Sequence, residues 1–289
     1  MSNKQIIGMI GTGVMGKSMA QHILKNGYEV VVYTRTKAKA DELIASGAVW
    51  QASVADVAKV ADIIITMIGT PKDVEEVYYG DNGIFAHAKL NTVLIDMTTS
   101  KPSLAIDIYQ EAKTKGMQSL DAPVSGGDVG AKNAALAIMV GGDQDVFDQM
   151  LPLLQVMGSN IVLQGKAGAG QHTKMVNQIS IAPAMIGLCE ALIYAKKAGL
   201  QPKKVLESIS TGAAGSWSLD NYAPRMIEGD FAPGFAIKHY IKDMKIALES
   251  AKEMKMDTPG LSLALEMYEK LASMGEDESG IHGLLKFYE

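Results

Sequence analysis

The sequence predicts an α/β fold, in which a doubly wound parallel sheet is followed by an all-α C-terminal domain. Up to about Leu163, short apolar runs alternate with helical patterns, as in strands that are joined by crossover helices. From Gly165 onward the periodicity is helical throughout. The glycine-rich stretch QGKAGAG, which begins at Gln164, separates the two patterns. We therefore expect one domain over residues 1–163 and a helical domain over residues 164–289.

Seven segments of the first domain have the length and composition of buried strands. The expected strands are 6–10, 30–33, 63–68, 93–96, 120–122, 136–140 and 160–163. Two of the helices between them, 17–26 and 102–115, are each followed by a glycine in the C-cap place. In the helical domain, Gly and Pro residues predict breaks at 199–202, 212–215, 233–234 and 259–260.

Composition limits the partners of the protein. The chain has 289 residues, of which 47% are hydrophobic and 20% charged, as in a soluble globular protein. The net charge is -5 and Lys and Arg never cluster beyond a pair, which argues against nucleic acid and anionic membranes as partners. The longest apolar run of the most apolar helix, 181–189, is shorter than the roughly 20 residues of a membrane span. We expect small-molecule partners.

Cysteine and histidine usage points to the same class of protein. Cys189 is the only cysteine, so an intrachain disulfide is impossible, and the five histidines do not have the spacing of a metal site. The apparent first strand begins a few residues after Met1, which leaves no room for a signal peptide. We expect a cytoplasmic protein without a metal.

The first strand is followed at once by the sequence GTGVMG, residues 11–16. In this context Gly11 makes a tight turn, Gly13 lets the backbone approach a pyrophosphate, and Gly16 permits close packing of helix and strand. The N–H groups at the helix start, at Val14 and Met15, favour an anion. The pattern predicts a Rossmann-type dinucleotide site. A kinase glycine-rich loop is excluded because no VAIK, HRD or DFG motif follows.

The end of the second strand indicates which nicotinamide cofactor fits. An NAD site has an Asp or Glu there, which accepts hydrogen bonds from the ribose 2′-OH. This chain has Thr34 in that place, followed by Arg35 and Thr36, whose donors suit the 2′-phosphate of NADP. We expect NADP in preference to NAD; the alternative is that Arg35 is a solvated surface charge. Further cofactor contacts are expected where two later strands end, at Ile68, Gly69, Thr98 and Thr99.

Four motifs resemble a known family. GMIGTGVMGKSMA (8–20), DAPVSGG (121–127), GAGQHTKMVNQ (168–178) and IKDMKIAL (241–248) occur in the order and spacing of the β-hydroxyacid dehydrogenases. That family includes 3-hydroxyisobutyrate dehydrogenase, tartronate semialdehyde reductase, and the glyoxylate and succinic semialdehyde reductases. The resemblance covers essentially the whole chain.

The resemblance implies a role for particular residues. It places a substrate-binding loop at Ser125, Gly126 and Gly127, the catalytic lysine at Lys174, and a cofactor-contacting lysine at Lys242. It also implies a cofactor contact at Thr99. An assisting amide is implied at Asn177 or Gln178; many members have Asn at both positions, so which amide touches substrate stays open. Asp243 is assigned no catalytic role.

The chemistry of these residue types agrees with a reductase. On a helix, Lys174, Asn177 and Gln178 share one polar corner. An ammonium beside an aldehyde oxygen stabilises the negative charge that hydride transfer creates there, and then delivers a proton. Partial burial is expected to lower the lysine pKa from its usual value of about 10.4. The alternative is a lysine that only extends its charged end from a core helix into water.

The loop at residues 125–127 bears on substrate binding, and the apolar helix at residues 175–195 bears on assembly. Successive N–H groups at Ser125, Gly126 and Gly127 suit a substrate carboxylate, although an ordinary loop turn would also explain the glycines. Residues 175–195 form a helix with more apolar face than its domain can cover, which favours a homodimer or homotetramer.

Together, these observations predict NADPH-dependent reduction of a small aldehyde acid (glyoxylate, succinic semialdehyde or tartronate semialdehyde) to the hydroxy acid, with Lys174 as general acid. One alternative is an NAD-dependent 3-hydroxyisobutyrate dehydrogenase that works oxidatively. Another is a non-catalytic nucleotide-binding protein.

Overall fold

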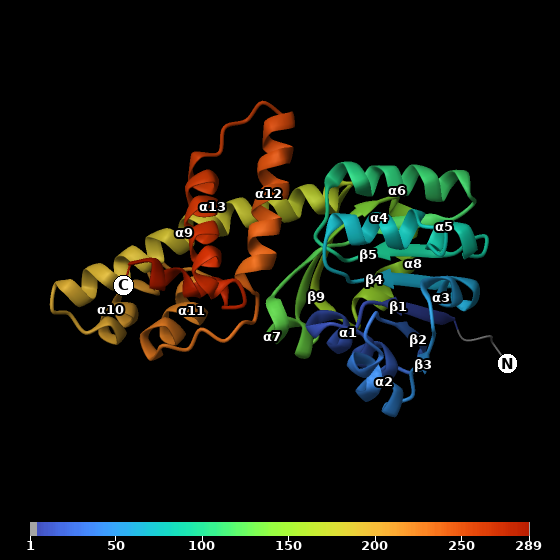
Figure 1. Ribbon diagram of the computed structural model, residues 1–289, viewed down its shortest axis with the longest axis horizontal. Coiled ribbons are helices and arrows are strands. Elements are labelled where there is room, and N and C mark those ends of the chain that lie inside the picture. Colours follow the sequence, from blue (N-terminus) through green and yellow to red (C-terminus); the bar gives the residue numbers. More distant parts are fainter. Residues whose placement is uncertain (1–4, 289) are drawn as a thin grey trace. The chain divides into compact units, whose positions relative to one another are not determined.

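The computed structural model describes residues 5–288. The chain forms two compact units, residues 1–174 and 175–289, and each has hydrophobic core clusters of its own (Figure 1). The division falls inside the long helix α9 (Ala169–Lys197). The expected domain boundary between residues 163 and 164 lies before this helix and stays a prediction.

The first unit is built on a sheet whose described strands run in the order β3-β2-β1-β4-β5-β6-β8-β7, with β9 paired to β8. The order reverses between β1 and β4, which makes the topological switch point at which open α/β sheets bind ligands. The strands are β1 (Ile6–Ile10), β2 (Glu29–Tyr33), β3 (Val49–Trp50), β4 (Ile63–Thr66), β5 (Val93–Asp96), β6 (Gln118–Asp121), β7 (Val124–Ser125), β8 (Leu136–Gly142) and β9 (Gly158–Gly165).

Helices cover both faces of this sheet. Successive strand residues alternate between two cores: Ile63 and Ile65 of β4 pack into one, and Ile64 packs into the other. The first core includes α1 (Val14–Lys25), α2 (Asp41–Ala45), α7 (Gly127–Lys132) and α8 (Gln144–Leu154). The second includes α3 (Val54–Val60), α4 (Pro71–Tyr79), α5 (Ile84–His87) and α6 (Pro102–Thr114). This two-sided burial explains why the strands are almost continuously apolar.

The sheet differs from the expected one in two respects. All seven expected strands are present, β1 and β5 with the expected bounds and the others with shifted ends. The strands β3 and β7 were missed because two residues are too short to show a periodicity. The sheet is also not parallel throughout, since β8 runs antiparallel to β6 and β7. Parallel neighbours need a crossover of about a dozen residues or more, and only the six-residue helix α7 lies between β7 and β8.

The second unit is helical, as expected. A bridge pairs Ala236 with Gly280 outside any named strand. The core of the unit combines side chains of α9, α11, α12, α13 and the C-terminal η3. After α9 the elements are α10 (Pro202–Ile209), α11 (Trp217–Glu228), α12 (Ile237–Glu253), α13 (Pro259–Leu271), the π-helical turn η2 (Ala272–Glu276) and the 3₁₀ segment η3 (Ile281–Tyr288).

Helix α9 is less buried within one chain than its apolar sequence suggests. Val176 and Tyr194 are 66% and 74% exposed, and Ala184, Gly187 and Ala191 between them are exposed as well. By length and composition α9 could cross a membrane, a test that core helices of soluble proteins also pass. This face of α9, mostly apolar but with the exposed Ser180 and Glu190 in it, is therefore left uncovered by residues 5–288 of the chain.

Candidate functional site

The glycine loop has the geometry that its sequence predicts. Gly11 has a φ of +97°, donates its N–H to the carbonyl of Tyr33 at 2.8 Å, and would place an added Cβ 2.2 Å from the Met67 carbonyl oxygen. A Cβ on Gly16 would lie 2.0 Å from the carbonyl oxygen of Gly11. Side chains at Gly11 and Gly16 are thus excluded by backbone, as a tight turn and a close helix–strand contact require.

The middle glycine faces open space instead. Within residues 5–288, no heavy atom lies within 4 Å of a Cβ built on Gly13 beyond its chain neighbours. Gly13 is the N-cap of α1, where the described structure places no side-chain cap and no acid in the first turn. The N–H groups of the first turn, which include those of Val14 and Met15, are therefore available to an anion. This cradle fits a dinucleotide pyrophosphate.

Arg35, which is expected to determine the preference for NADP, forms an ion pair with Asp73. The Nη1 atom of Arg35, at the carboxyl end of β2, lies 3.2 Å from Oδ1 of Asp73 in the first turn of α4. The other oxygen of Asp73 accepts the N–H of Thr70, in the capping box of α4. The Arg35 side chain is 81% exposed, so this ion pair adds little stability, but it fixes where the guanidinium lies. Thr34 and Thr36 flank it.

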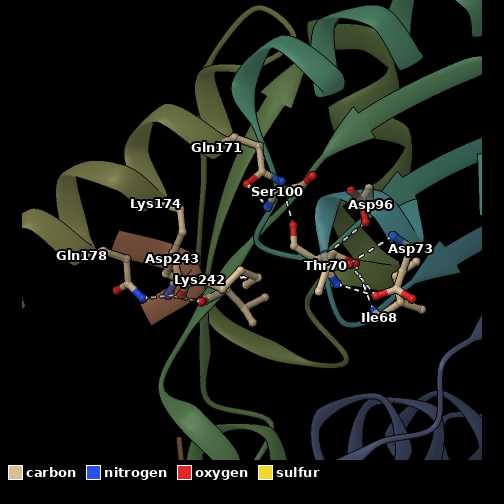
Figure 2. Close-up of polar contacts among 12 residues, drawn as sticks. Ile68, Thr70, Asp73, Asp96, Ser100, Gln171, Lys174, Gln178, Lys242 and Asp243 are labelled. Carbon is tan, nitrogen blue, oxygen red and sulfur yellow. Dashed lines mark hydrogen bonds and ion pairs between the residues drawn. The ribbon is translucent and has the colours of Figure 1, made fainter. Parts of the chain in front are cut away.

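The loops that follow β4 and β5 are joined by hydrogen bonds. The Ile68 N–H donates to Oγ1 of Thr98 at 3.0 Å, and the Thr98 N–H donates to Oδ1 of Asp96 at 3.1 Å (Figure 2). Burial raises the pKa of Asp96 to about 6, although hydrogen bonds from Thr66 and Thr98 oppose this shift. The expected contacts Gly69 and Thr99 are half-buried in these two loops.

The expected substrate loop lies between β7 and α7. Gly126 and Gly127 have φ values of +124° and +61°, a region that side chains disfavour, and α7 begins at Gly127. Ser125 and both glycines are half-buried. The loop therefore presents a glycine backbone at its surface, as an anion pocket requires.

The structure brings Lys174 to this loop. The lysine is 6% exposed, and its Nζ donates to the carbonyl oxygen of Val124 at 2.9 Å. Val124 directly precedes Ser125, so the ammonium lies beside the expected carboxylate-binding backbone. Both residues belong to the first compact unit. A lysine that only extended into water would be more exposed than this one.

Two buried side chains hold the start of α9, and sequence reasoning assigned neither of them a role. The Asp121 carboxylate accepts the N–H groups of Gly168 and Gln171, each at 2.8 Å. Burial raises the pKa of Asp121 in spite of these donors. The Gln171 side chain accepts the Ser100 N–H at 2.9 Å and donates to the Thr98 carbonyl at 2.7 Å (Figure 2). Their positions in DAPVSGG and GAGQHTK were the available signal.

In the second unit, the expected amides form a chain of polar contacts. Nδ2 of Asn177 donates to Oε1 of Gln178 at 2.8 Å. Nε2 of Gln178 in turn donates to Oδ2 of Asp243 at 2.6 Å (Figure 2). Lys242 pairs with the other oxygen of Asp243 at 3.0 Å. Gln178 and Asp243 are both 1% exposed. Asp243, which sequence reasoning set aside, therefore fixes the orientation of the Gln178 amide.

The described residues offer no cluster of metal ligands. Within 5–288, no group of three or more His, Cys, Asp or Glu side chains is placed so that it could hold a metal ion. Within the first unit, the donor groups at the expected site are the backbone N–H groups of the 125–127 loop and the Lys174 ammonium, which suit anions and carbonyl oxygens.

Comparison with known proteins agrees with this geometry. The family model of the NAD binding domain of 6-phosphogluconate dehydrogenase matches residues 6–165, and that of the NAD-binding domain of NADP-dependent 3-hydroxyisobutyrate dehydrogenase matches residues 168–288. The oxidoreductase YkwC of Bacillus subtilis is 59% identical over 99% of both chains. The 2-hydroxy-3-oxopropionate reductase of Escherichia coli is 36% identical over 98% of this chain and 97% of its own.

A solved structure extends the likeness to three dimensions. The 3-hydroxyisobutyrate dehydrogenase of Mycobacterium tuberculosis, whose structure includes L-serine, has a TM-score of 0.90 and 29% identity over 99% of each chain. Fold, motifs and relatives together define an NAD(P)-dependent oxidoreductase of hydroxy acids. The chain belongs to the β-hydroxyacid dehydrogenase family.

Proposed function

We propose that the protein reduces a small aldehyde acid to the corresponding hydroxy acid with NADPH, and that Lys174 is the general acid. The observation that carries this proposal is the buried Lys174 ammonium, held at 2.9 Å on the Val124 carbonyl beside the Ser125–Gly127 backbone. The substrates proposed are glyoxylate, succinic semialdehyde and tartronate semialdehyde. The last is the substrate that the name of the E. coli relative indicates.

The residues supply the binding and proton steps of this reaction. A bound NADPH would supply the hydride for the aldehyde carbon, and the residues of the chain would bind the substrate and deliver the proton. Negative charge then grows on the aldehyde oxygen, where Lys174 stabilises it and donates the proton that completes the hydroxyl group. The N–H groups of Ser125, Gly126 and Gly127 bind the substrate carboxylate. An amide of Asn177 or Gln178 assists in orienting the substrate.

The NADPH preference is supported by the end of β2. Thr34 stands where an acid would hold the ribose diol of NAD and repel a 2′-phosphate. The exposed Arg35 guanidinium, oriented by Asp73, has further donors for that phosphate. Lys242 is proposed as an additional cofactor contact.

A second candidate is the oxidative reaction of an NAD-dependent 3-hydroxyisobutyrate dehydrogenase. The likeness to the M. tuberculosis enzyme of that name favours it. In that direction a neutral Lys174 would remove the hydroxyl proton of the substrate. A non-catalytic nucleotide-binding role would leave the buried lysine and the glycine loop beside it without a purpose.

A steady-state screen separates these candidates. Aldehyde acids and hydroxy acids of two to five carbons are assayed with both cofactors in both directions. We expect the highest kcat/KM for an aldehyde acid with NADPH. Preferential oxidation of 3-hydroxyisobutyrate with NAD would favour the second candidate, and no turnover over the whole panel would favour the non-catalytic one.

The assembly and location of the protein are also proposed. The uncovered and mostly apolar face of α9, from Val176 to Tyr194, supports burial against a second copy, as a homodimer or homotetramer. The cytoplasm is proposed as the location on the sequence alone. Light scattering at micromolar concentration tests the assembly. A strictly monomeric mass would contradict it.

A further inference from the structure

The first turn of α9 contains a glutamine that no catalytic role explains. Gln171 is fully buried, at 0% exposure, and precedes Lys174 by three residues on the same helix. Its side-chain amide makes both of its hydrogen bonds to the backbone of one short segment, to the Ser100 N–H and the Thr98 carbonyl. A buried amide that is paired in this way has a single orientation.

The backbone of the same turn is held independently. Asp121, at the end of β6, accepts the N–H groups of Gly168 and Gln171 and so satisfies donors that the helix itself leaves free. A negative group is also favoured at a helix N-terminus. The start of α9 is therefore attached to two neighbouring strand ends, through Asp121 to β6 and through Gln171 to the segment after β5.

The segment that Gln171 contacts is one of those expected to contact the cofactor. Thr99, the expected cofactor contact, lies between Thr98 and Ser100, the two residues whose backbone the Gln171 amide binds. The next turn of α9 carries Lys174, whose Nζ reaches the Val124 carbonyl. The glutamine thus connects the segment expected to contact the nicotinamide cofactor to the helix that carries the proton donor.

We infer that Gln171 is a positioning residue that sets the distance between the bound cofactor and Lys174, with Asp121 holding the backbone of the same turn. The inference rests on the proposed function, in which hydride and proton reach the two ends of one carbonyl group. Both transfers need the hydride donor and the proton donor at the correct distance from that carbonyl group. A displacement of about 1 Å can reduce the rate by roughly 10²-fold. Gln171 touches neither reacting atom and acts through Thr98, Ser100 and Lys174.

The test is Gln171→Met, which keeps a long unbranched side chain and removes both amide hydrogen bonds. We expect kcat to fall by roughly 10- to 100-fold, with a much smaller change in KM for NADPH. With NADPH deuterated at the transferred hydrogen, the kinetic isotope effect on kcat should increase, because slower chemistry becomes rate-limiting over product release. A loss of stability alone would not change the isotope effect of the molecules that remain folded.

A matched control comes from the second unit. The buried Tyr268 hydroxyl donates to the Ile281 carbonyl at 2.7 Å, the same length as the bond from Gln171 to the Thr98 carbonyl. Tyr268→Phe also leaves a buried carbonyl without its side-chain donor. We expect it to lower Tm while leaving kcat and the isotope effect unchanged.

The outcomes are distinguishable. If Gln171→Met lowers Tm as Tyr268→Phe does but keeps the parent kcat and isotope effect, the positioning role is overturned. If Gln171→Met does not fold, Gln171→Glu is assayed in its place. Its ionised carboxylate keeps the acceptor for the Ser100 N–H and lacks the donor to the Thr98 carbonyl. A lower kcat with a larger isotope effect would support the positioning role, and the parent values of both would overturn it. Failure of the proposed function would show separately, as full turnover by Lys174→Ala.

Discussion

Two buried glutamines, Gln171 in the first compact unit and Gln178 in the second, are held in different ways. In the first unit, the Gln171 amide binds backbone groups of Thr98 and Ser100 just after β5, and Asp121 at the end of β6 binds backbone N–H groups at the start of α9. In the second unit, the Gln178 amide binds another side chain, the carboxylate of Asp243. The first arrangement depends on where the sheet ends, and the second depends on one pair of side chains on two different helices.

This difference determines which substitutions are tolerated around each of the two glutamines. Where backbone groups supply the partners, the shape of the main chain is critical, so glycines and strand ends limit substitution. Where side chains supply the partners, removing one leaves the other buried and unsatisfied, whatever the backbone does. Substitutions that alter the backbone or remove one side-chain partner should therefore have different effects, and the largest is expected in the glycine loop.

One added methyl group should have different effects at two glycines of the same loop, on stability at Gly16 and on NADPH affinity at Gly13. Gly16→Ala places a Cβ 2.0 Å from a backbone oxygen, whereas Gly13→Ala places it in open space. We expect Gly16→Ala to lower the free energy of unfolding by about 3 kcal/mol or more, because the backbone must shift. Gly13→Ala should stay as stable as the parent but lose NADPH affinity, because its methyl group occupies the approach of the pyrophosphate.

Urea unfolding and NADPH titration measure both effects. Equal stability losses for the two variants would show that the loop geometry is not backbone-limited. Unchanged NADPH affinity in Gly13→Ala would place the pyrophosphate elsewhere.

The stability of the first unit should fall as pH rises, because of Asp96. Its pKa is raised from 3.8 to about 6, so the folded state binds the proton more tightly than the unfolded state does. This contribution is therefore present at low pH and is lost between about pH 4 and 6, with a size of about 3 kcal/mol at most. Asp96→Asn should remove that loss, so that Tm of the variant relative to the parent rises across this window. A constant difference in Tm would contradict the shift.

The second unit should show the opposite slope, because of His282. The buried imidazole bonds through Nε2 to the Asp230 carbonyl and stacks on Tyr222, and burial lowers its pKa below 6.5. The folded state keeps the ring neutral while the unfolded state takes up a proton, so stability is lost as pH falls below 6.5. His282→Gln, which can still donate to the Asp230 carbonyl, should reduce the fall in Tm below pH 6.5. An unchanged fall in Tm would rule out His282 as its source.

The smallest expected effect is on cofactor preference, at an exposed edge of the first unit. The unmodified protein should favour NADPH over NADH by roughly tenfold in kcat/KM, about 1.4 kcal/mol. Replacing Thr34 with Asp and Arg35 with Ala should reverse the order, because the new acid binds the ribose diol and repels the 2′-phosphate. Equal or better use of NADH by the parent would show that Arg35 does not bind a phosphate.

Local patterns explain how much of the fold and site could be predicted. The strands β1 and β5 were placed to the residue, because their apolar runs are bounded by turn signals. The glycine loop was predicted with its geometry, because Gly11, Gly13 and Gly16 act within six residues of one another. Lys174 came from a motif shared with a family, and the structure adds its contact with Val124.

Contacts between distant parts of the chain could not be predicted in this way. Arg35 and Asp73 meet because β2 ends and α4 begins at the same edge of the sheet. Gln178 and Asp243 are 65 residues apart, and no periodicity in either helix indicates the other. The antiparallel strand β8 depends on the short connection through α7, whose consequence appears only once the sheet is assembled.

The central claim is that Lys174 donates the proton, and single-turnover reduction by Lys174→Ala tests it most directly. The variant is mixed with NADPH and the best aldehyde acid of the screen, and NADPH oxidation is followed after its affinity has been measured separately. We expect normal NADPH affinity with a rate lower by roughly 10²-fold or more, the usual scale for a general acid. A rate within a few-fold of the parent would contradict the assignment of Lys174 and the reaction proposed for this site.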